Sequence, residues 1–165
     1  MKDCQYHCYC QTNSVEESQN LGCAIGAYMI HSAQPLCVAL IGDLGTGKTH
    51  ISQGIGRGFG VKEEMTSPTF ALMNTYRVGR HSLYHFDLYR LEELSELEGI
   101  GFYEYTDDQQ SIVEWADKFQ EELPDETLWI YIKRMDDTTR SITMMSDVLD
   151  DGILRQLGGS YVVGN

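Results

Sequence analysis

One short segment of the chain has the residue types and the spacing of a phosphate-binding loop. It matches the pattern G-x-x-x-x-G-K-[ST] at every fixed position, with the residues Gly42, Asp43, Leu44, Gly45, Thr46, Gly47, Lys48 and Thr49. Glycines let the backbone bend until successive N–H groups point inward and form a nest for an anion. A helix that follows such a loop directs its positive end at the same place. The segment therefore predicts a site for the phosphates of a nucleoside triphosphate.

The last two residues of this segment have separate chemical roles. Lys48 is predicted to contact the β- and γ-phosphates, and the hydroxyl of Thr49 to be a ligand of Mg²⁺. The simple alternative is a glycine-rich turn that carries a surface lysine. Average residue frequencies put a chance match in a chain of this length below about 1%. We therefore favour the nucleotide site.

A phosphate-binding loop also needs a carboxylate on the side of the metal. Two acidic residues stand at the ends of predicted strands: Asp87 follows Leu-Tyr-His-Phe at 83–86, and Glu114 follows Ile112 and Val113. Either can reach the loop if its strand lies beside residues 36–41. The pattern alone leaves open an ordinary solvated acid or a helix cap at both positions.

Several other polar and aromatic residues are weaker candidates. Thr66, Ser67 and Thr69 occupy a loop after the first helix, where nucleotide switches place a hydroxyl near the γ-phosphate, although a simple turn fits the same residues. For the remaining three, the pattern alone favours structural roles: a hydrogen-bonded strand histidine, a core tryptophan and an exposed strand arginine. These are His85, Trp115 and Arg140.

The elements that must position these residues follow from hydrophobic periodicity. Ser14 with Glu17 three residues later is a capping box, and it predicts an amphipathic helix over 15–31. Residues 36–41 form an uninterrupted apolar run, which is typical of a strand buried on both faces of a parallel sheet. A helix is predicted from about 49 to 59, although its three glycines weaken it.

The second half of the chain reads as further strands and a final helix. We predict two antiparallel hairpins, at 70–77 with 82–87 and at 128–132 with 141–145. We also predict a helical stretch at 88–97, a short buried strand at 111–115 and a last helix at 147–157. The fold class is therefore α/β: a single-domain sandwich of the P-loop NTPase type, with a mixed, partly antiparallel sheet flanked by helices.

Length and cysteine content set the domain organisation. The 165 residues suffice for one domain, which we place at 13–157, with a flexible extension at 1–12 and a C-terminal tail at 158–165. The five cysteines are an odd number and no secretory signal precedes them, so we expect reduced thiols in the cytoplasm. No apolar run reaches the roughly 18 residues of a membrane span.

The chain is strongly acidic, with a formal net charge of −13. Such a surface repels phosphate backbones, and no basic stripe offsets it. Binding of tRNA or DNA by this chain alone is therefore not expected. The acidity fits either a basic protein partner or a surface charge that keeps the protein soluble.

Four stretches together resemble the TsaE family, small bacterial ATPases needed to make threonylcarbamoyladenosine (t6A) on tRNA. They are the phosphate-binding loop at 42–49, Thr-Ser-Pro-Thr-Phe at 66–70, Tyr-His-Phe-Asp-Leu-Tyr-Arg-Leu at 84–91, and Val-Glu-Trp-Ala at 113–116. The resemblance covers about residues 14–145. The third stretch is the most distinctive, because phosphate-loop proteins in general lack it.

The resemblance implies roles for single residues. It implies that Glu114 holds Mg²⁺ with Thr49, that Asp87 stands in for a Walker B aspartate, and that 66–69 acts as a switch-like segment. Trp115, Arg140 and His50 are implied to lie at the nucleotide, and the turn around Ser14 near its base. His50 departs from the family, which has a small residue or threonine there.

The resemblance also implies an activity and partners. It implies a Mg²⁺-dependent ATPase, slow alone, that binds ATP or ADP and acts on a transferase complex of TsaB and TsaD. Lys48, Asp87 and Glu114 would be its catalytic residues. Three alternatives remain: a small-molecule or nucleotide kinase, a GTP-binding switch, and a module that holds nucleotide without hydrolysing it. The kinase lacks an arginine-bearing lid here, and the switch lacks an Asn-Lys-x-Asp segment.

Overall fold

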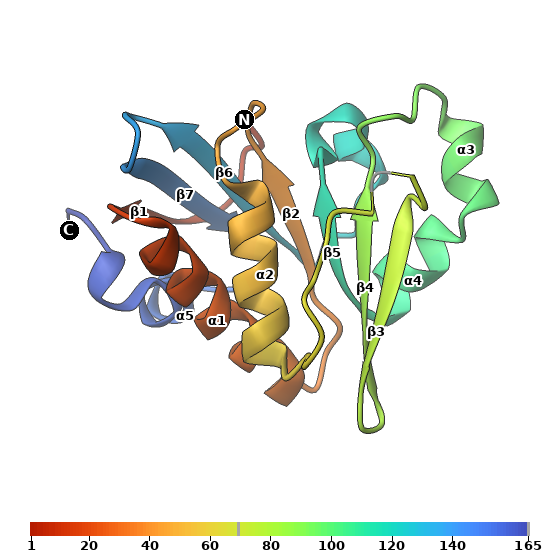
Figure 1. The fold of residues 1–165 in the computed structure, drawn as a ribbon, viewed down its shortest axis with the longest axis horizontal. Helices are drawn as coiled ribbons and strands as arrows, with labels where there is room; N and C mark the ends of the chain where they lie inside the picture. The colour runs from red at the N-terminus through yellow and green to blue at the C-terminus, as the bar shows by residue number, and fades with distance from the viewer. Residues whose placement is uncertain (69, 165) are drawn as a thin grey trace.

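A seven-stranded mixed sheet forms the centre of the protein in a computed structural model that describes residues 1–68 and 70–164 (Figure 1). The strand order is β1-β7-β6-β2-β5-β4-β3. The bounds are β1 Tyr6–Thr12, β2 Cys37–Ile41, β3 Met73–Val78, β4 His81–Asp87, β5 Gln110–Glu114, β6 Thr127–Arg134 and β7 Arg140–Ser146.

The middle of the sheet is parallel and its edges are antiparallel. Strand β2 pairs in parallel with β5 and β6, and β4 pairs in parallel with β5. The two predicted hairpins are present as β3 with β4 and β6 with β7. These pairings confirm the predicted fold class, a mixed sheet with antiparallel parts.

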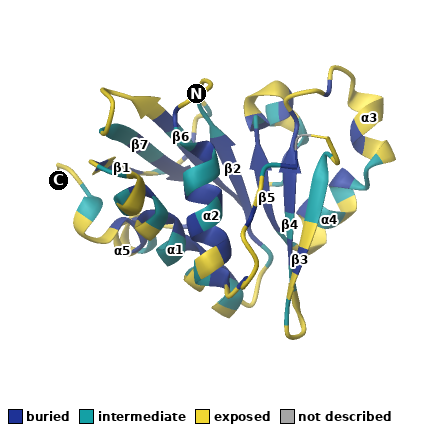
Figure 2. Ribbon diagram, viewed as in Figure 1, coloured by how far each residue is buried: buried dark blue, intermediate teal, exposed yellow. Residues whose placement is uncertain are grey.

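Helices cover both faces of the sheet, so the strands between them are largely buried (Figure 2). On one face lie α1 Val15–His31, α2 Lys48–Phe59 and α5 Asp151–Gly158, which share one hydrophobic core with the sheet. On the other lie α3 Leu94–Gly99, α4 Phe102–Asp108 and the 3-10 helix η1 Ala116–Glu122, around a second core. A short 3-10 turn, η2 Gly159–Tyr161, follows α5. No helix in the described part of the chain is long and apolar enough to span a membrane.

Helix α1 begins where its capping residues predict. The hydroxyl of Ser14 accepts a hydrogen bond from the backbone N–H of Glu17 at 3.0 Å, and the carboxylate of Glu17 accepts one from the N–H of Asn13 at 2.6 Å. Two N–H groups that the helix itself cannot satisfy are thereby paired.

The glycines of α1 and α2 allow these two helices to touch through their backbones. A Cβ added at Gly22 or Gly26 of α1 would lie closer than 3.0 Å to carbonyl oxygens of α2. The same holds for Gly54 and Gly58 of α2 against carbonyl oxygens of α1. The glycines that weaken α2 as an isolated helix are therefore what its packing requires.

The prediction of a flexible extension at residues 1–12 is wrong. Residues 6–12 form β1, which pairs with all seven residues of β7. Side chains alternate between outside and inside, and Cys8 and Cys10 are buried. Cysteine packs as a small hydrophobic residue, so the spacing of these thiols is that of a half-buried strand.

Other boundaries also shift. Residues 88–93 are not helical, because α3 begins only at Leu94, and a second short helix, α4, follows it. The last helix begins after Asp150, whose carboxylate accepts a hydrogen bond from the N–H of Ile153. The predicted tail folds back in part, since Val162 forms a β-bridge with Cys10.

Candidate nucleotide site

The loop between β2 and α2 has the backbone shape that its glycines predict. Gly45 and Gly47 have φ angles of +78° and +104°, a region that favours glycine because it has no Cβ. Thr46 donates hydrogen bonds from its N–H and its hydroxyl to the carbonyl of Asp43. Helix α2 starts directly after Gly47, so its unpaired N–H groups face the loop.

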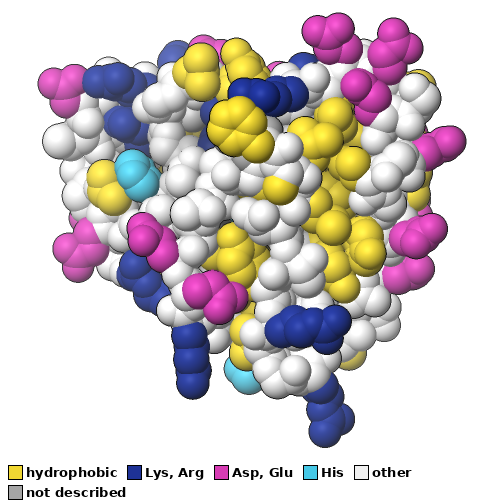
Figure 3. Space-filling model, turned by 45° about the vertical axis from the view of Figure 1, so that its right-hand side comes forward, with side chains coloured by type: hydrophobic (Ala, Val, Ile, Leu, Met, Phe, Trp, Pro, Cys, Tyr) yellow, Lys and Arg dark blue, Asp and Glu magenta, His cyan; other side chains and the backbone are white. Residues whose placement is uncertain are grey.

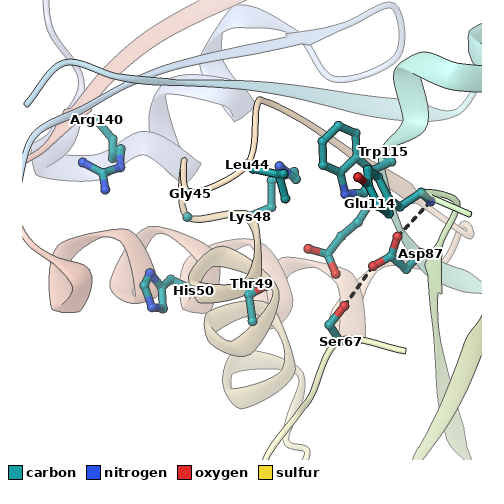
Figure 4. A pocket seen from close by; sticks show the side chains of 12 residues that line it. Leu44, Gly45, Lys48, Thr49, His50, Ser67, Asp87, Glu114, Trp115 and Arg140 are labelled. Carbon is teal, nitrogen blue, oxygen red and sulfur yellow. Dashed lines mark hydrogen bonds between the residues drawn. The ribbon is translucent and has the colours of Figure 1, made fainter. Parts of the chain in front are cut away.

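The loop forms one wall of a cavity of about 460 Å³ (Figure 4). It gathers most of the predicted site residues from five different parts of the chain. The lining residues are Leu44, Gly45, Gly47, Lys48, Thr49, His50, Ser67, Asp87, Tyr89, Glu114, Trp115 and Arg140. Of the predicted residues, Asp43 and Thr66 do not line this cavity, Thr46 lines an adjoining hollow, and Thr69 lies outside the described residues.

Lys48 rests against its own loop. Its ammonium group donates hydrogen bonds to the carbonyl oxygens of Gly42 and, at 2.9 Å, of Asp43, and it lies 4.3 Å from the centre of the Trp115 ring. Burial lowers the pKa of Lys48 below its ordinary value, against the opposing attraction of Glu114. The positive charge at the loop is thus held by backbone oxygens and an aromatic face.

The two acidic candidates lie side by side. Asp87 ends β4 and Glu114 ends β5, and the two residues are partners in the parallel pairing of these strands. Both are buried, and both side chains face the loop because β5 also pairs with β2, the strand that leads into it. The strand ends therefore bring together two carboxylates that are distant in sequence.

Hydrogen bonds fix the carboxylate of Asp87. One oxygen accepts from the backbone N–H of Tyr89 at 3.0 Å, and the other accepts from the hydroxyl of Ser67 at 2.8 Å. The second bond ties the switch-like loop to the end of β4 (Figure 4). The carbonyl of Thr66 accepts from the side chain of Asn74, and the Thr66 side chain is exposed.

Two aromatic residues complete the wall opposite α2. Trp115 has a φ of +59°, and such a conformation in a residue with a Cβ costs on the order of 1 kcal/mol. Its ring lies 4.8 Å from that of Tyr89. Sequence reasoning missed Tyr89 as a lining residue. Its place two positions after Asp87, just beyond the end of β4, is the signal that could have found it.

Arg140 reaches the loop from β7. Its Nε donates to the carbonyl of Thr46 at 2.7 Å, and its Nη1 donates to the carbonyl of Asp136 at 2.9 Å. Arg140, Gly47 and His50 also line a smaller adjoining hollow of about 160 Å³, together with Ser14, Val15, Ser18, Thr46, Asp137 and Thr138. The two hollows together offer room for phosphates on one side of the loop and a further group beside α1.

The donor set at the loop suits Mg²⁺. Thr49 supplies a hydroxyl and Glu114 a carboxylate, with Asp87 beside it. Among the described residues no group of three or more His, Cys, Asp or Glu side chains could hold a metal ion unaided. Mg²⁺ is commonly bound in this way, by one or two carboxylates together with phosphate oxygens and waters and not by a full protein cage.

The sequence is similar to known proteins over most of its length. The sequence matches the family described as threonylcarbamoyl adenosine biosynthesis protein TsaE over residues 12–142. Relatives named as tRNA threonylcarbamoyladenosine biosynthesis protein TsaE include one from Bacillus subtilis, 44% identical over 64% of this chain and 66% of that protein. The protein of that name from Treponema pallidum is 35% identical over 82% of this chain and 98% of its own length.

A solved structure has the same fold over nearly the whole chain. The crystal structure of YdiB from Bacillus subtilis superposes with a TM-score of 0.70 at 28% sequence identity. The superposition covers 95% of this chain and 97% of that one.

Proposed function

The chain belongs to the TsaE family, and from that premise we propose that it is a Mg²⁺-dependent ATPase that serves the transfer of a threonylcarbamoyl group to tRNA. Family membership makes it a nucleotide-binding protein of t6A biosynthesis. The observation that carries the proposal is the shared cavity, in which Lys48 and Thr49 of the loop face Asp87 and Glu114. Together these groups can bind a nucleoside triphosphate and a metal ion.

In the proposed reaction, water attacks the γ-phosphate in line with the bond that breaks. The N–H groups at residues 44–49 and the ammonium of Lys48 hold the phosphates, and Lys48 must leave its two carbonyl partners to do so. Thr49 and Glu114 would hold Mg²⁺, which neutralises charge on the phosphate oxygens. Asp87, fixed by Ser67 and Tyr89, would orient the waters around the metal.

Arg140 and Trp115 would shape the rest of the site. Arg140 already bridges Thr46 and the β6–β7 turn, so its charge is held beside the loop. The indole of Trp115 covers Lys48 and limits the access of bulk water to it. Exclusion of water strengthens the attraction between the lysine and phosphate oxygens.

The transferase proteins TsaB and TsaD are the proposed partners, and the cytoplasm the proposed compartment. The support is chemical: the net charge of −13 argues against tRNA binding by this chain alone. On the face shown in Figure 3, lysine and arginine side chains lie in several separate places and form no continuous stripe. The tRNA would accordingly be held by the partners, and nucleotide turnover here would act on their complex.

Calorimetric titration of ATP and GTP, with and without Mg²⁺, tests the proposal on the wild type, Lys48→Ala and Glu114→Ala. We expect ATP binding that Lys48→Ala weakens strongly, and a Mg²⁺ dependence that Glu114→Ala loses. Release of phosphate should be slow and should change when purified TsaB and TsaD are added. Equal ATP binding with and without Lys48 would contradict the proposal. Transfer of phosphate to an added small acceptor would favour a kinase instead.

A further inference from the structure

Directly behind the two carboxylates lies a buried histidine to which the proposed mechanism gives no role. Nε2 of His85 lies 2.7 Å from Oε2 of Glu114, and the side chains are 1% and 3% exposed. His85 does not line the cavity, so it cannot touch a nucleotide there. Its contact with the site passes through Glu114.

We propose that His85 is the positioning residue of the metal-binding carboxylate: it fixes Glu114 so that the carboxylate faces Thr49. This inference rests on the proposed function, because it assumes that Glu114 is a metal ligand. It extends that function to a residue outside the cavity.

The burial of Glu114 makes such a partner necessary. A buried carboxylate without hydrogen bonds is strongly destabilising, because nothing replaces the water that it loses on burial. Among the described residues, Glu114 has no ion pair with a lysine or arginine, and the imidazole of His85 is the hydrogen-bond partner of its carboxylate. His85 therefore decides where the carboxylate can rest.

The register of the sheet sets the direction of this bond. Asp87 pairs with Glu114, and His85 pairs with Ile112, so His85 lies on the same side of β4 as Asp87 but one side-chain repeat further from the loop. From there it can reach only the rear of Glu114. With one oxygen held from behind, the other is free to face the loop, the side from which Figure 4 shows Lys48 and Thr49 approaching.

The other ring nitrogen indicates the tautomer. Nδ1 of His85 is buried and has no hydrogen-bond partner among the described residues. A proton on Nδ1 would leave an N–H group without an acceptor, which is costly in the interior. The hydrogen-bond geometry therefore favours the tautomer with its proton on Nε2, a donor aimed at Glu114. Histidines and carboxylates behind metal ligands act in this way, and their loss typically weakens metal binding about 10- to 100-fold.

The test compares substitutions that differ only in where they place a donor. In His85→Gln the amide nitrogen occupies the position of Nε2, whereas in His85→Asn it stops near the position of Nδ1. His85→Leu removes the donor altogether, and His81→Leu, at the exposed start of the same strand, is the control. The readout is the affinity for ADP by calorimetry, measured with and without Mg²⁺, together with the melting temperature of each free protein.

We expect His85→Leu and His85→Asn to bind ADP without Mg²⁺ as the wild type does. The gain in affinity on adding Mg²⁺ should fall about 10- to 100-fold in both, and His85→Gln should restore most of it. A purely structural role would lower both affinities together, in step with melting temperature. If the leucine variant does not fold, the Gln and Asn pair still decides.

Two results would overturn the inference. One is that Mg²⁺ raises the ADP affinity of His85→Asn as much as that of the wild type. The other is that this increase falls equally in the Gln and Asn variants. If Mg²⁺ does not raise the ADP affinity of the wild type, the metal part of the proposed function fails, and the positioning role fails with it. Loss of ADP binding in Lys48→Ala alone would leave the inference standing.

Discussion

At the scale of single residues, Lys48 has to exchange its partners when it binds a phosphate. It gives up two carbonyl oxygens and part of its contact with Trp115. Burial has already removed much of its hydration, which lowers its pKa and leaves less water to displace. The loop therefore holds the charge ready at a modest cost in free energy.

The first prediction concerns this exchange. Lys48→Ala should weaken ATP binding about 10- to 100-fold, because hydrogen bonds to charged groups contribute about 1.5–3 kcal/mol each. Lys62→Ala, an exposed lysine outside the cavity, should bind ATP as the wild type does. Calorimetry on both variants checks this, and equal affinities in the two would contradict it.

The second prediction concerns buried thiols. Burial raises the pKa of Cys10 and of Cys37 to about 12, from an ordinary value of 9.0. Between pH 9 and 12 the unfolded chain loses protons that the folded chain keeps, so these thiols favour unfolding increasingly as pH rises. The free energy of unfolding should therefore fall above pH 9.

Urea unfolding of the wild type and of Cys37→Ala at several pH values checks this second prediction. The decline between pH 9 and 11 should be less steep in Cys37→Ala. Between pH 6 and 8 the thiol is protonated in both states, so the two proteins should show parallel pH dependence. An equally steep decline above pH 9 in both proteins would count against burial of this thiol.

The site residues divide by the kind of information that reveals them. The loop at 42–49 is predictable because a local motif specifies its backbone. Asp87 and Glu114 could be named as acids at strand ends, but only the register of β4 with β5 makes them neighbours. The position of His85 behind Glu114 depends on that same register, and no local pattern contains it.

At the scale of elements, the contact between α1 and α2 reverses a simple rule. Alanine favours a helix over glycine by about 1 kcal/mol, and α2 contains three glycines in five residues. Packing overrides that preference, because the backbones of α1 and α2 meet at Gly54 and Gly58, and the side chain of Met65 packs against Gly56. The position of the loop before α2 and the position of Ser14 before α1 are thereby coupled.

The third prediction follows from this contact. Gly26→Ala should lower the free energy of unfolding by about 1–3 kcal/mol, the usual cost of overpacking, despite the gain in helix preference. Its added methyl group would collide with the carbonyl of Ile55. Gly99→Ala is the matched control, since nothing lies within 4 Å of a Cβ there. Stabilisation by Gly26→Ala in chemical denaturation would rule out the close approach.

Elements marked by a cap, by strong periodicity or by an apolar run were predictable, and the short helices were not placed correctly. Helix α1 and strand β2 have their predicted positions because a capping residue and an apolar run mark them. Helices α3 and α4 have only 6 and 7 residues, too few for a periodic signal. The buried side chains of strand β1 are two cysteines and a threonine, so its sequence does not show the usual alternation of apolar and polar residues.

At the scale of the whole molecule, β1 connects the start of the sequence to the nucleotide site. Thr12 is the register partner of Arg140, the residue that holds the loop through Thr46. The edge strand thus supports the first residue of β7 from one side, while β6 supports it from the other. Sequence alone could not give this arrangement, because the strand order does not follow the chain order.

The fourth prediction tests that support. A chain lacking residues 1–12 should unfold at a lower denaturant concentration, because β7 would lose its neighbour and its buried side chains would be exposed. It should also bind ATP more weakly, since Arg140 would sit at a free edge. Tyr9→Ala, a change on the exposed side of β1, should leave both properties close to those of the wild type. An unchanged unfolding midpoint in the shortened chain would contradict the prediction.

The pairing of β1 with β7 also has a consequence for synthesis on the ribosome. Tyr6 pairs with Ser146, so β1 has to wait during synthesis until β7 has been made. Until then the side chains of Cys8 and Cys10, which are buried in the folded protein, are exposed to oxidants and chaperones. Such distant pairing also makes folding slow. The cell therefore obtains a finished nucleotide site only after β7 has been made and has paired with β1.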